Sequence, residues 1–185
     1  MDDLQAIRRL KNGDIGGLES LIACYQGKAL RTAFLVTQDE MAAEDVVYAA
    51  FVRFYERIRY FDEKRAFEPY FLRSVVNAAL NVVRHEKKNI PLDAESELPG
   101  IESLLAHAAK VEEQVEFLQA KQQIREALLA LPTRQRTAII LRYYLEMNEK
   151  EMAQQLDAPA GTIKWLLNAA RARLRELLGA ERFVE

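Results

Sequence analysis

Apolar residues recur every three or four positions along most of this chain, which is the spacing of one face of an α-helix. No stretch shows the alternation of apolar and polar residues that is typical of a half-buried strand. The pattern therefore predicts an all-α protein. The helices that we expect cover residues 4–10, 18–36, 41–59, 69–88, 111–130, 133–146, 148–156 and 160–178.

Residues with known preferences for helix ends mark several of these boundaries. The run Asn12-Gly13-Asp14 ends the first helix, and residues 37–40 (TQDE) provide a junction with an N-cap. Pro69 stands at a favoured early helix position. Further along the chain, Leu131-Pro132-Thr133 and Asp157-Ala158-Pro159-Ala160 interrupt the helical pattern.

Residues 91–111 have the composition of a linker, because Pro91, Pro99 and Gly100 interrupt them and carboxylates dominate their charge. We therefore expect two small helical domains, residues 1–90 and 112–185, joined by an acidic linker. Domains of this size bury only about 60 to 65 % of the surface of their unfolded chains, so they are marginally stable and tend to depend on partners.

The formal net charge of −2 is unevenly distributed along the chain. Residues 1–90 hold 14 Lys and Arg against 13 Asp and Glu, residues 91–121 hold 2 against 7, and residues 122–185 hold 10 against 8. The acidity thus lies between two nearly neutral ends that carry local basic clusters. Such clusters can bind DNA, but only weakly by themselves, which indicates a partner that supplies most of the affinity.

The sparse cysteines and histidines limit the chemistry. Cys24 is the single cysteine, so a disulfide within the chain and a cysteine-based zinc site are excluded. It lies in the apolar run LIACY, and we expect it to be a small buried residue. We expect no metal, no cofactor and no catalytic residue, since no nucleophile–base pair or phosphate loop is visible.

We expect a cytoplasmic protein without membrane insertion. The sequence shows no signal peptide and no apolar run of about 18 residues or more.

The last two predicted helices have the pattern of a helix-turn-helix. A small residue, Ala153, lies where the helices would cross, a tight turn follows at residues 157–160, and Ile163 provides a buried aliphatic side chain in the second helix. The N-terminal part of that second helix would then face the major groove of DNA. A plain helical hairpin with a solvated basic face has the same pattern, so the pattern alone leaves both interpretations open.

Three segments, taken in order, resemble parts of one known family, the sigma-70 family of bacterial RNA polymerase sigma factors. Residues 43–55 (AEDVVYAAFVRFY) resemble region 2.2, the helix that grips the clamp coiled coil of core RNA polymerase. Residues 67–77 (FEPYFLRSVVN), with Asn81 and Arg84, resemble the segment that melts and reads the −10 promoter element. The resemblance to region 4, which binds the −35 element, lies in residues 131–144, 151–153, 161–164 and 170–175.

The short length and the brief acidic linker resemble the extracytoplasmic-function (ECF) group of that family. This resemblance implies a factor that directs bacterial core RNA polymerase to specific promoters and initiates transcription. It implies core polymerase and promoter DNA as partners, and an anti-sigma factor as a further partner of many members. The alternative is a sigma-like regulator or decoy with altered or lost promoter reading.

The resemblance implies a polymerase-binding face on residues 41–59. Asp45, Tyr48, Val52 and Arg53 recur there at three- and four-residue spacings, so they form one outward stripe. A carboxylate, an aromatic ring and an arginine together are typical of a protein-binding anchor, and a solvated face with a half-buried tyrosine is the alternative. Family members usually carry polar residues where this chain has Tyr48 and Ala49.

The resemblance also implies a face for the −10 element on residues 69–88. A cationic track with polar and aromatic groups suits unstacked single-stranded DNA. Tyr70 stands where the family usually has Trp, and a core position for it is the alternative; Asn81 stands where the family often has Asp. The residues expected on this face are Tyr70, Arg73, Asn77, Asn81, Arg84, Lys87 and Lys88.

For the −35 element, the expected residues are Arg136, Thr162, Lys164, Trp165, Asn168, Arg171 and Arg173. Lys164 can reach guanine or phosphate, Asn168 can read adenine, and Trp165 can contact a thymine methyl group. The family commonly has Ser-Arg where this chain has Trp165-Leu166. Three interpretations follow: Trp165 faces DNA, both side chains form an apolar patch for a protein, or Leu166 is buried and only Trp165 is exposed.

Overall fold

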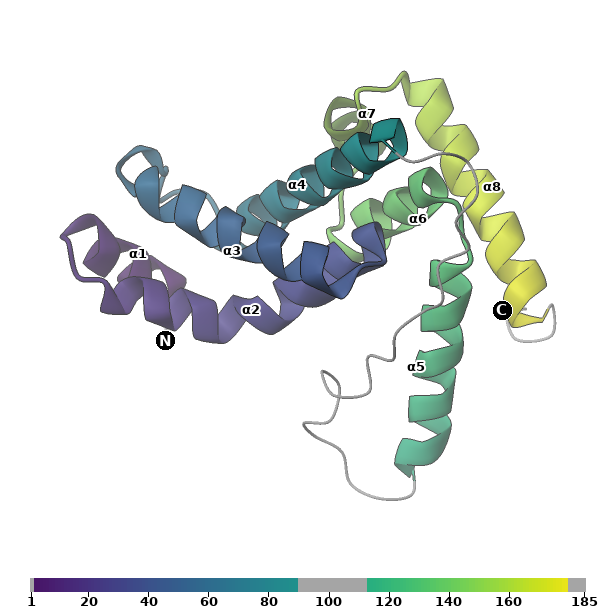
Figure 1. The fold of residues 1–185 in the computed structure, drawn as a ribbon, viewed down its shortest axis with the longest axis horizontal. Coiled ribbons are helices and arrows are strands. Elements are labelled where there is room, and N and C mark those ends of the chain that lie inside the picture. Colours follow the sequence, from purple (N-terminus) through teal and green to yellow (C-terminus); the bar gives the residue numbers. More distant parts are fainter. Residues whose placement is uncertain (1, 90–112, 180–185) are drawn as a thin grey trace. The chain divides into compact units, whose positions relative to one another are not determined.

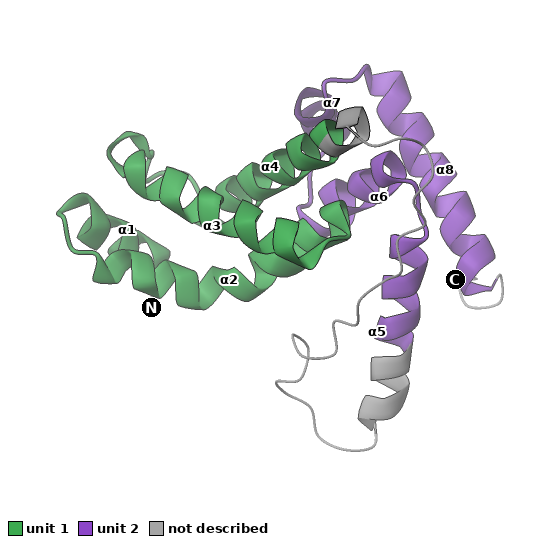
Figure 2. Ribbon diagram, viewed as in Figure 1, with its two compact units in different colours: residues 1–95 green, residues 96–185 purple. Residues whose placement is uncertain are grey.

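The computed structural model describes the backbone of residues 2–89 and 113–179, and the side chains of residues 2–85 and 120–179. The chain divides into two compact units, residues 1–95 and 96–185 (Figure 2). Within the described residues every regular element is helical and no strand occurs (Figure 1), which confirms the all-α prediction. The expected linker at residues 91–111 lies outside the described residues, so the domain limits at 90 and 112 stay predictions.

The first unit is a bundle in which α2 packs against α1, α3 and α4, while α3 also packs against α4. The helix α2 therefore contacts each of the other three α-helices of the unit. Its elements are α1 (Asp3–Lys11), α2 (Gly16–Thr37), α3 (Glu40–Glu56), the 3₁₀ turn η1 (Ile58–Tyr60) and α4 (Phe67–Asn89).

Aromatic rings fill the centre of this unit. Phe71 stacks on Phe67 with ring centroids 5.2 Å apart and lies 4.3 Å from Phe51. Phe54 meets Phe67 edge-on at 4.8 Å, and Phe61 lies 5.5 Å from Phe54. Edge-to-face and offset pairs of this kind add about 0.5–1.5 kcal/mol each beyond the burial of their area. They hold α3, the turn after it and α4 together as one core.

The junction at residues 37–40 contains the N-cap that the sequence predicted. The Asp39 side chain accepts a hydrogen bond from the Ala42 backbone N–H at 2.8 Å and caps α3. Gln38, just before it, adopts the left-handed conformation that ends α2. Between α1 and α2 the backbones approach closely at Gly17, where an added Cβ would lie 2.2 Å from the Ala6 carbonyl oxygen. Only glycine fits at this crossing.

In the second unit, α8 packs against α5, α6 and α7. Its buried side chains include Ile163, Leu166 and Leu167 of α8 together with Leu141 and Met152. The elements are α5 (Glu113–Leu129), α6 (Thr133–Ile139), the π-helical turn η2 (Ile140–Tyr144), α7 (Glu149–Leu156) and α8 (Ala160–Leu178).

The helix-turn-helix prediction is confirmed as a fold. A capping box starts α7: Asn148 accepts from the Glu151 backbone N–H, and the Glu151 side chain accepts from that of Asn148. Asp157, in the left-handed conformation, ends α7, and α8 begins at Ala160. The turn is one residue shorter than expected, and Ile163 is buried as predicted.

Two expected helices are interrupted. The helix expected over 41–59 ends at Glu56, and the tighter turn η1 that follows lets both Ile58 and Phe61 reach the core. The helix expected over 133–146 changes to a π-helical turn after Ile139, in which the Leu145 N–H donates to the Ile140 carbonyl at 3.1 Å. Periodicity over short runs does not distinguish these variants from an α-helix.

The prediction for Cys24 was wrong, because this residue is exposed. The buried side of α2 follows Gly17, Leu21, Ala29 and Thr32. Successive residues turn by about 100°, so position 24 lies to one side of this stripe. The apolar run around Cys24 encircles the helix and therefore did not indicate which side is buried.

The expectation that Arg136 contacts DNA was also wrong. Only 1 % of this residue is exposed. Its Nη1 donates to the carbonyls of Leu129, at 3.0 Å, and Leu131, at 2.9 Å. These carbonyls end α5 and its following turn, where a helix leaves acceptors without helical partners. Burial lowers the pKa of Arg136 to about 10, so the group stays protonated at neutral pH.

We predict that Arg136→Met destabilises the second unit by about 2–4 kcal/mol, because two buried carbonyl acceptors lose their donor. Urea unfolding followed by far-ultraviolet circular dichroism and by the fluorescence of Trp165, the only tryptophan, measures this loss. Arg134→Met, at an exposed position of the same helix, is the matched control. Equal unfolding free energies for the two variants would show that the buried guanidinium is dispensable.

Candidate protein and nucleic-acid interfaces

One face of α3 is buried and the other is exposed. Val47 and Phe51 lie in the core, while the predicted stripe is open to solvent, with Tyr48 74 % exposed. The carboxylate, the ring and the guanidinium thus lie side by side along one helix, as their spacing predicted. All four residues of the stripe, Asp45, Tyr48, Val52 and Arg53, are exposed.

The exposed stripe is longer than the sequence reasoning proposed. Met41 and Tyr55 are exposed as well, and they continue the same three- and four-residue spacing at either end. Large apolar groups on the surface of so small a unit are typical of a protein interface. Extending the spacing by one step in each direction would have found both residues from the sequence.

The outer face of α4 is polar. Asn77, Asn81 and Arg84 are exposed, and Arg73 is half-buried. Tyr70 is 38 % exposed, and its ring meets Phe61 edge-on at 5.0 Å. The core interpretation of Tyr70 is therefore confirmed in part, because the ring packs on Phe61, while the contact of its exposed part with DNA stays a prediction. Lys87 and Lys88 lie outside the residues whose side chains are described.

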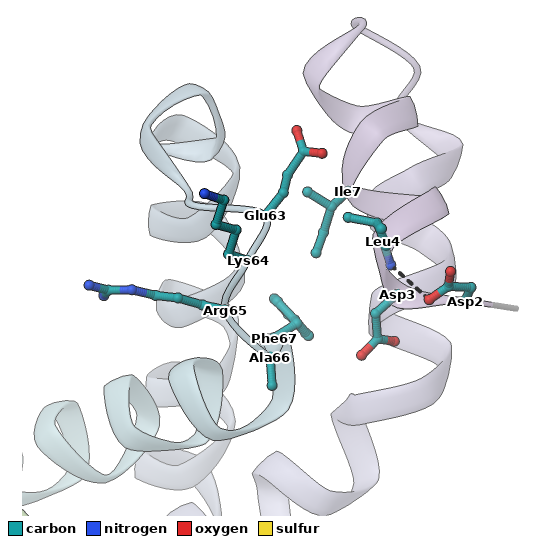
Figure 3. Close-up of a pocket in the computed structure, with 9 residues that line it drawn as sticks. All are labelled: Asp2, Asp3, Leu4, Ile7, Glu63, Lys64, Arg65, Ala66 and Phe67. Atoms are coloured by element: carbon teal, nitrogen blue, oxygen red, sulfur yellow. Dashed lines mark hydrogen bonds between the residues drawn. The ribbon is translucent and has the colours of Figure 1, made fainter.

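The connection that precedes α4 is tied to α1. Lys11 Nζ donates to the Phe61 carbonyl at 2.8 Å and to Glu63 at 3.0 Å, and Arg8 pairs with Glu63 at 2.9 Å. The Arg8 and Lys11 side chains hold the pKa of Glu63 below its usual value. A pocket of about 300 Å³ lies between this connection and the start of α1, with Lys64 and Arg65 extending away from α1 (Figure 3).

The exposed face of α8 begins with the predicted reading residues. Lys164 and Asn168 are exposed, Thr162 is half-buried, and Trp165 is 63 % exposed. Leu166 is buried in the core of the second unit. The third interpretation of this dipeptide is therefore confirmed: Leu166 is a core residue and Trp165 alone faces outward.

Further along α8, Arg171 contacts a residue of another element. Its Nε donates to the Tyr143 hydroxyl of η2 at 2.9 Å, and its Nη1 lies 3.4 Å from Asn168 Oδ1. Arg173 pairs with Glu176 at 2.8 Å instead. The sequence reasoning missed Tyr143, because nothing in the local pattern relates it to a residue 28 positions away.

The described residues contain no group of three or more His, Cys, Asp or Glu side chains that could hold a metal ion. None of their helices is long and apolar enough to cross a membrane.

Models of two sigma-70 regions match this chain, region 2 over residues 21–89 and region 4 over residues 121–174. The chain is 30 % identical over 178 residues to the ECF RNA polymerase sigma factor SigW of Bacillus subtilis, which covers 93 % of this chain and 94 % of the relative. It is 28 % identical over 169 residues to the RNA polymerase sigma-E factor of Streptomyces coelicolor, with 91 % and 89 % covered.

Two solved structures have the same fold. One is the sigma factor RpoE in complex with the anti-sigma factor NepR from Bartonella quintana, with a TM-score of 0.59, 19 % identity, and 89 % and 98 % of the two chains covered. The other is CnrH in complex with the cytosolic domain of CnrY, with a TM-score of 0.59, 20 % identity, and 97 % and 98 % covered.

The matched segments contain the exposed faces of α3, α4 and α8, and the 30 % identity extends over nearly the whole chain. This protein therefore belongs to the sigma-70 family and is an ECF sigma factor, which directs RNA polymerase to promoters.

Proposed function

We propose that three helix faces of this sigma factor have separate binding roles. The outer face of α3 binds core RNA polymerase, the outer face of α4 opens and reads the −10 element, and the exposed face of α8 docks on the −35 element. The observation that carries this proposal is that each helix buries its apolar side in its own unit. The side that stays exposed lies within the segments that the models of regions 2 and 4 match.

For the polymerase contact, the support is the mixed chemistry of the α3 stripe. Tyr48 and Val52 offer apolar area, while Asp45 and Arg53 offer charges on the same side. Aromatic and arginine side chains dominate the binding energy of protein interfaces. Since polymerase transcribes in the cytoplasm, we place the action of this factor there, and we assign the covalent chemistry to the polymerase.

For the −10 element, the support is the polar surface of α4. The amide side chains of Asn77 and Asn81 can pair with base edges, and Arg84 can pair with a phosphate. The Tyr70 ring is anchored by Phe61 on one edge, so stacking of a base on its open face would cost little side-chain entropy.

For the −35 element, Lys164 and Trp165 occupy the first turns of α8, where a recognition helix meets base edges. Trp165 presents apolar surface, which suits a thymine methyl group. An anti-sigma factor is a further proposed partner, because one solved structure of the same fold is a complex with such a protein.

A second candidate function is a sigma-like regulator with altered promoter reading. Trp165 favours it, because a large exposed apolar side chain stands on the reading face where the family commonly has a polar residue. Transcription by holoenzyme across a genomic fragment library separates the candidates. Promoter-specific transcripts support initiation, whereas polymerase binding without any such transcript supports the regulator.

We predict that Tyr48→Ala weakens binding to bacterial core RNA polymerase by roughly 10- to 30-fold, because truncating an aromatic anchor costs about 2 kcal/mol. Fluorescence anisotropy of the labelled full-length protein titrated with core enzyme measures it. Tyr60→Ala, at an exposed tyrosine outside the α3 stripe, serves as the control. A folded Tyr48→Ala variant with parental affinity would remove α3 from the polymerase interface.

For the α4 face, Arg84→Gln should weaken binding of holoenzyme to the single-stranded non-template −10 strand several-fold. Loss of one phosphate contact should also reduce the slope of log affinity against log salt by about 0.7. The control is Arg31→Gln, at an exposed arginine of α2. The assignment fails if the salt slope of Arg84→Gln equals that of the parent.

For the α8 face, Trp165→Ala should flatten the base preference at one position of the −35 element by about 1 kcal/mol, because a thymine methyl group loses its apolar contact. Competitive run-off transcription on promoters selected from the genomic library, with each −35 base pair varied, measures this preference. Leu177→Ala, an exposed apolar residue near the other end of α8, should leave it unchanged. An unaltered preference in Trp165→Ala would mean that this ring reads no base.

A further inference from the structure

Tyr143 and Arg171 form a polar pair on the surface of the second unit. Tyr143, in η2, is 59 % exposed, and its hydroxyl oxygen accepts from Arg171 Nε of α8 at 2.9 Å. The guanidinium carbon lies 5.8 Å from the centroid of the same ring. Asn168, one turn earlier on α8, lies against the guanidinium through a longer contact of 3.4 Å. Groups from two elements thus fix the direction of one cation.

The hydrogen bonds of this pair leave donors available. A tyrosine hydroxyl that accepts a hydrogen bond still has its own proton to donate. Two of the five guanidinium N–H groups of Arg171 are engaged, and three have no partner among the described residues. A hydroxyl donor beside a cation with several N–H donors suits an anionic oxygen acceptor such as a phosphodiester.

The place of the pair on α8 indicates which anion it meets. Lys164, Asn168 and Arg171 follow one another at four- and three-residue spacings, so they share a face of the helix. Arg171 lies about 10 Å along the axis from Lys164. When the first turns of such a helix meet base edges, a group two turns further along lies near the edge of the groove, where the phosphates are.

We propose that Tyr143 and Arg171 form a contact site for one phosphate of the duplex at the −35 element, with Tyr143 as the residue that positions Arg171. This inference rests on the proposed docking of α8 on DNA. Arg171 supplies the charge, and Tyr143 holds the guanidinium by its hydroxyl and adds one donor. Asn168 then helps to orient Arg171 by accepting from its Nη1. The residues that contact bases are Lys164 and Trp165.

Tyr143 lies in the π-helical turn η2. Residues 140–144 form one wide turn, after which Leu145 donates back to Ile140. Such turns shift the direction of side chains relative to an α-helix and are frequent at functional sites. The neighbouring Tyr144 is an exposed tyrosine of the same turn, and the hydroxyl that accepts from Arg171 belongs to Tyr143, so Tyr144 provides the matched control.

The test measures binding of the full-length protein to a fluorescein-labelled duplex of mixed sequence at several KCl concentrations. We expect Arg171→Ala to reduce the slope of log affinity against log salt by about one, the loss of one phosphate contact. Tyr143→Phe should weaken binding roughly 2- to 10-fold, the effect of one hydrogen bond. Its thermal unfolding midpoint should equal that of the parent, and Tyr144→Phe should bind like the parent.

A double-mutant cycle separates positioning from a structural role. If Tyr143 acts through Arg171, most of the effect of Tyr143→Phe should disappear in the Arg171→Ala background. An equal loss of affinity in both backgrounds, or a lowered unfolding midpoint for Tyr143→Phe, overturns the positioning role.

The outcome for Lys164→Ala separates this inference from the proposed function. If Lys164→Ala weakens binding while Arg171→Ala and Tyr143→Phe bind like the parent, the phosphate site is wrong and the docking of α8 stands. If none of the three variants changes affinity, the docking of α8 on DNA is itself wrong, and the phosphate site fails with it.

Discussion

Each functional helix of this protein must bury one side in a small core and present the other side to a partner. The burial of apolar area is the main source of stability for such units. The residues on the inward sides of α3, α4 and α8 must therefore be apolar and of suitable size. The outward sides contribute little to folding and can therefore carry charge, amides and exposed rings. Binding surfaces and core are thus two sides of the same helices, with the direction of each binding side chain fixed by the packing behind it.

In the first unit the aromatic cluster connects two binding faces. Phe51 and Phe54 of α3 pack on Phe67 and Phe71 of α4. The proposed polymerase-binding stripe and the proposed −10 face therefore lie on two helices that share one core. Lys11 and Arg8 hold the connection before α4 from the other side, through Glu63. A shift of one helix would be transmitted to the other through these rings, because closely packed interiors do not deform smoothly.

In the second unit, three arginines that were expected to bind DNA have different environments. Arg136 is buried and donates hydrogen bonds to two backbone carbonyls at and just after the end of α5. Arg171 stays at the surface, held by Tyr143. Arg173 pairs within α8. Charge counts and spacing do not distinguish these three residues. Only the burial and the hydrogen-bond partners of each guanidinium decide which of them can contact a phosphate.

The sequence by itself determined the all-α class, the order of the helices, the N-capped junction at residues 37–40 and the outward stripe of α3, because these depend on periodicity and on local hydrogen bonds. It did not determine that Cys24 is exposed, that Arg136 is buried, that α1 crosses α2 at Gly17, or that Tyr143 meets Arg171. Each of these depends on which element packs on which side, a property of contacts between residues far apart in the chain. Periodicity indicates that a helix has a buried side, whereas the neighbouring helices decide how wide that side is and which polar groups it must accommodate.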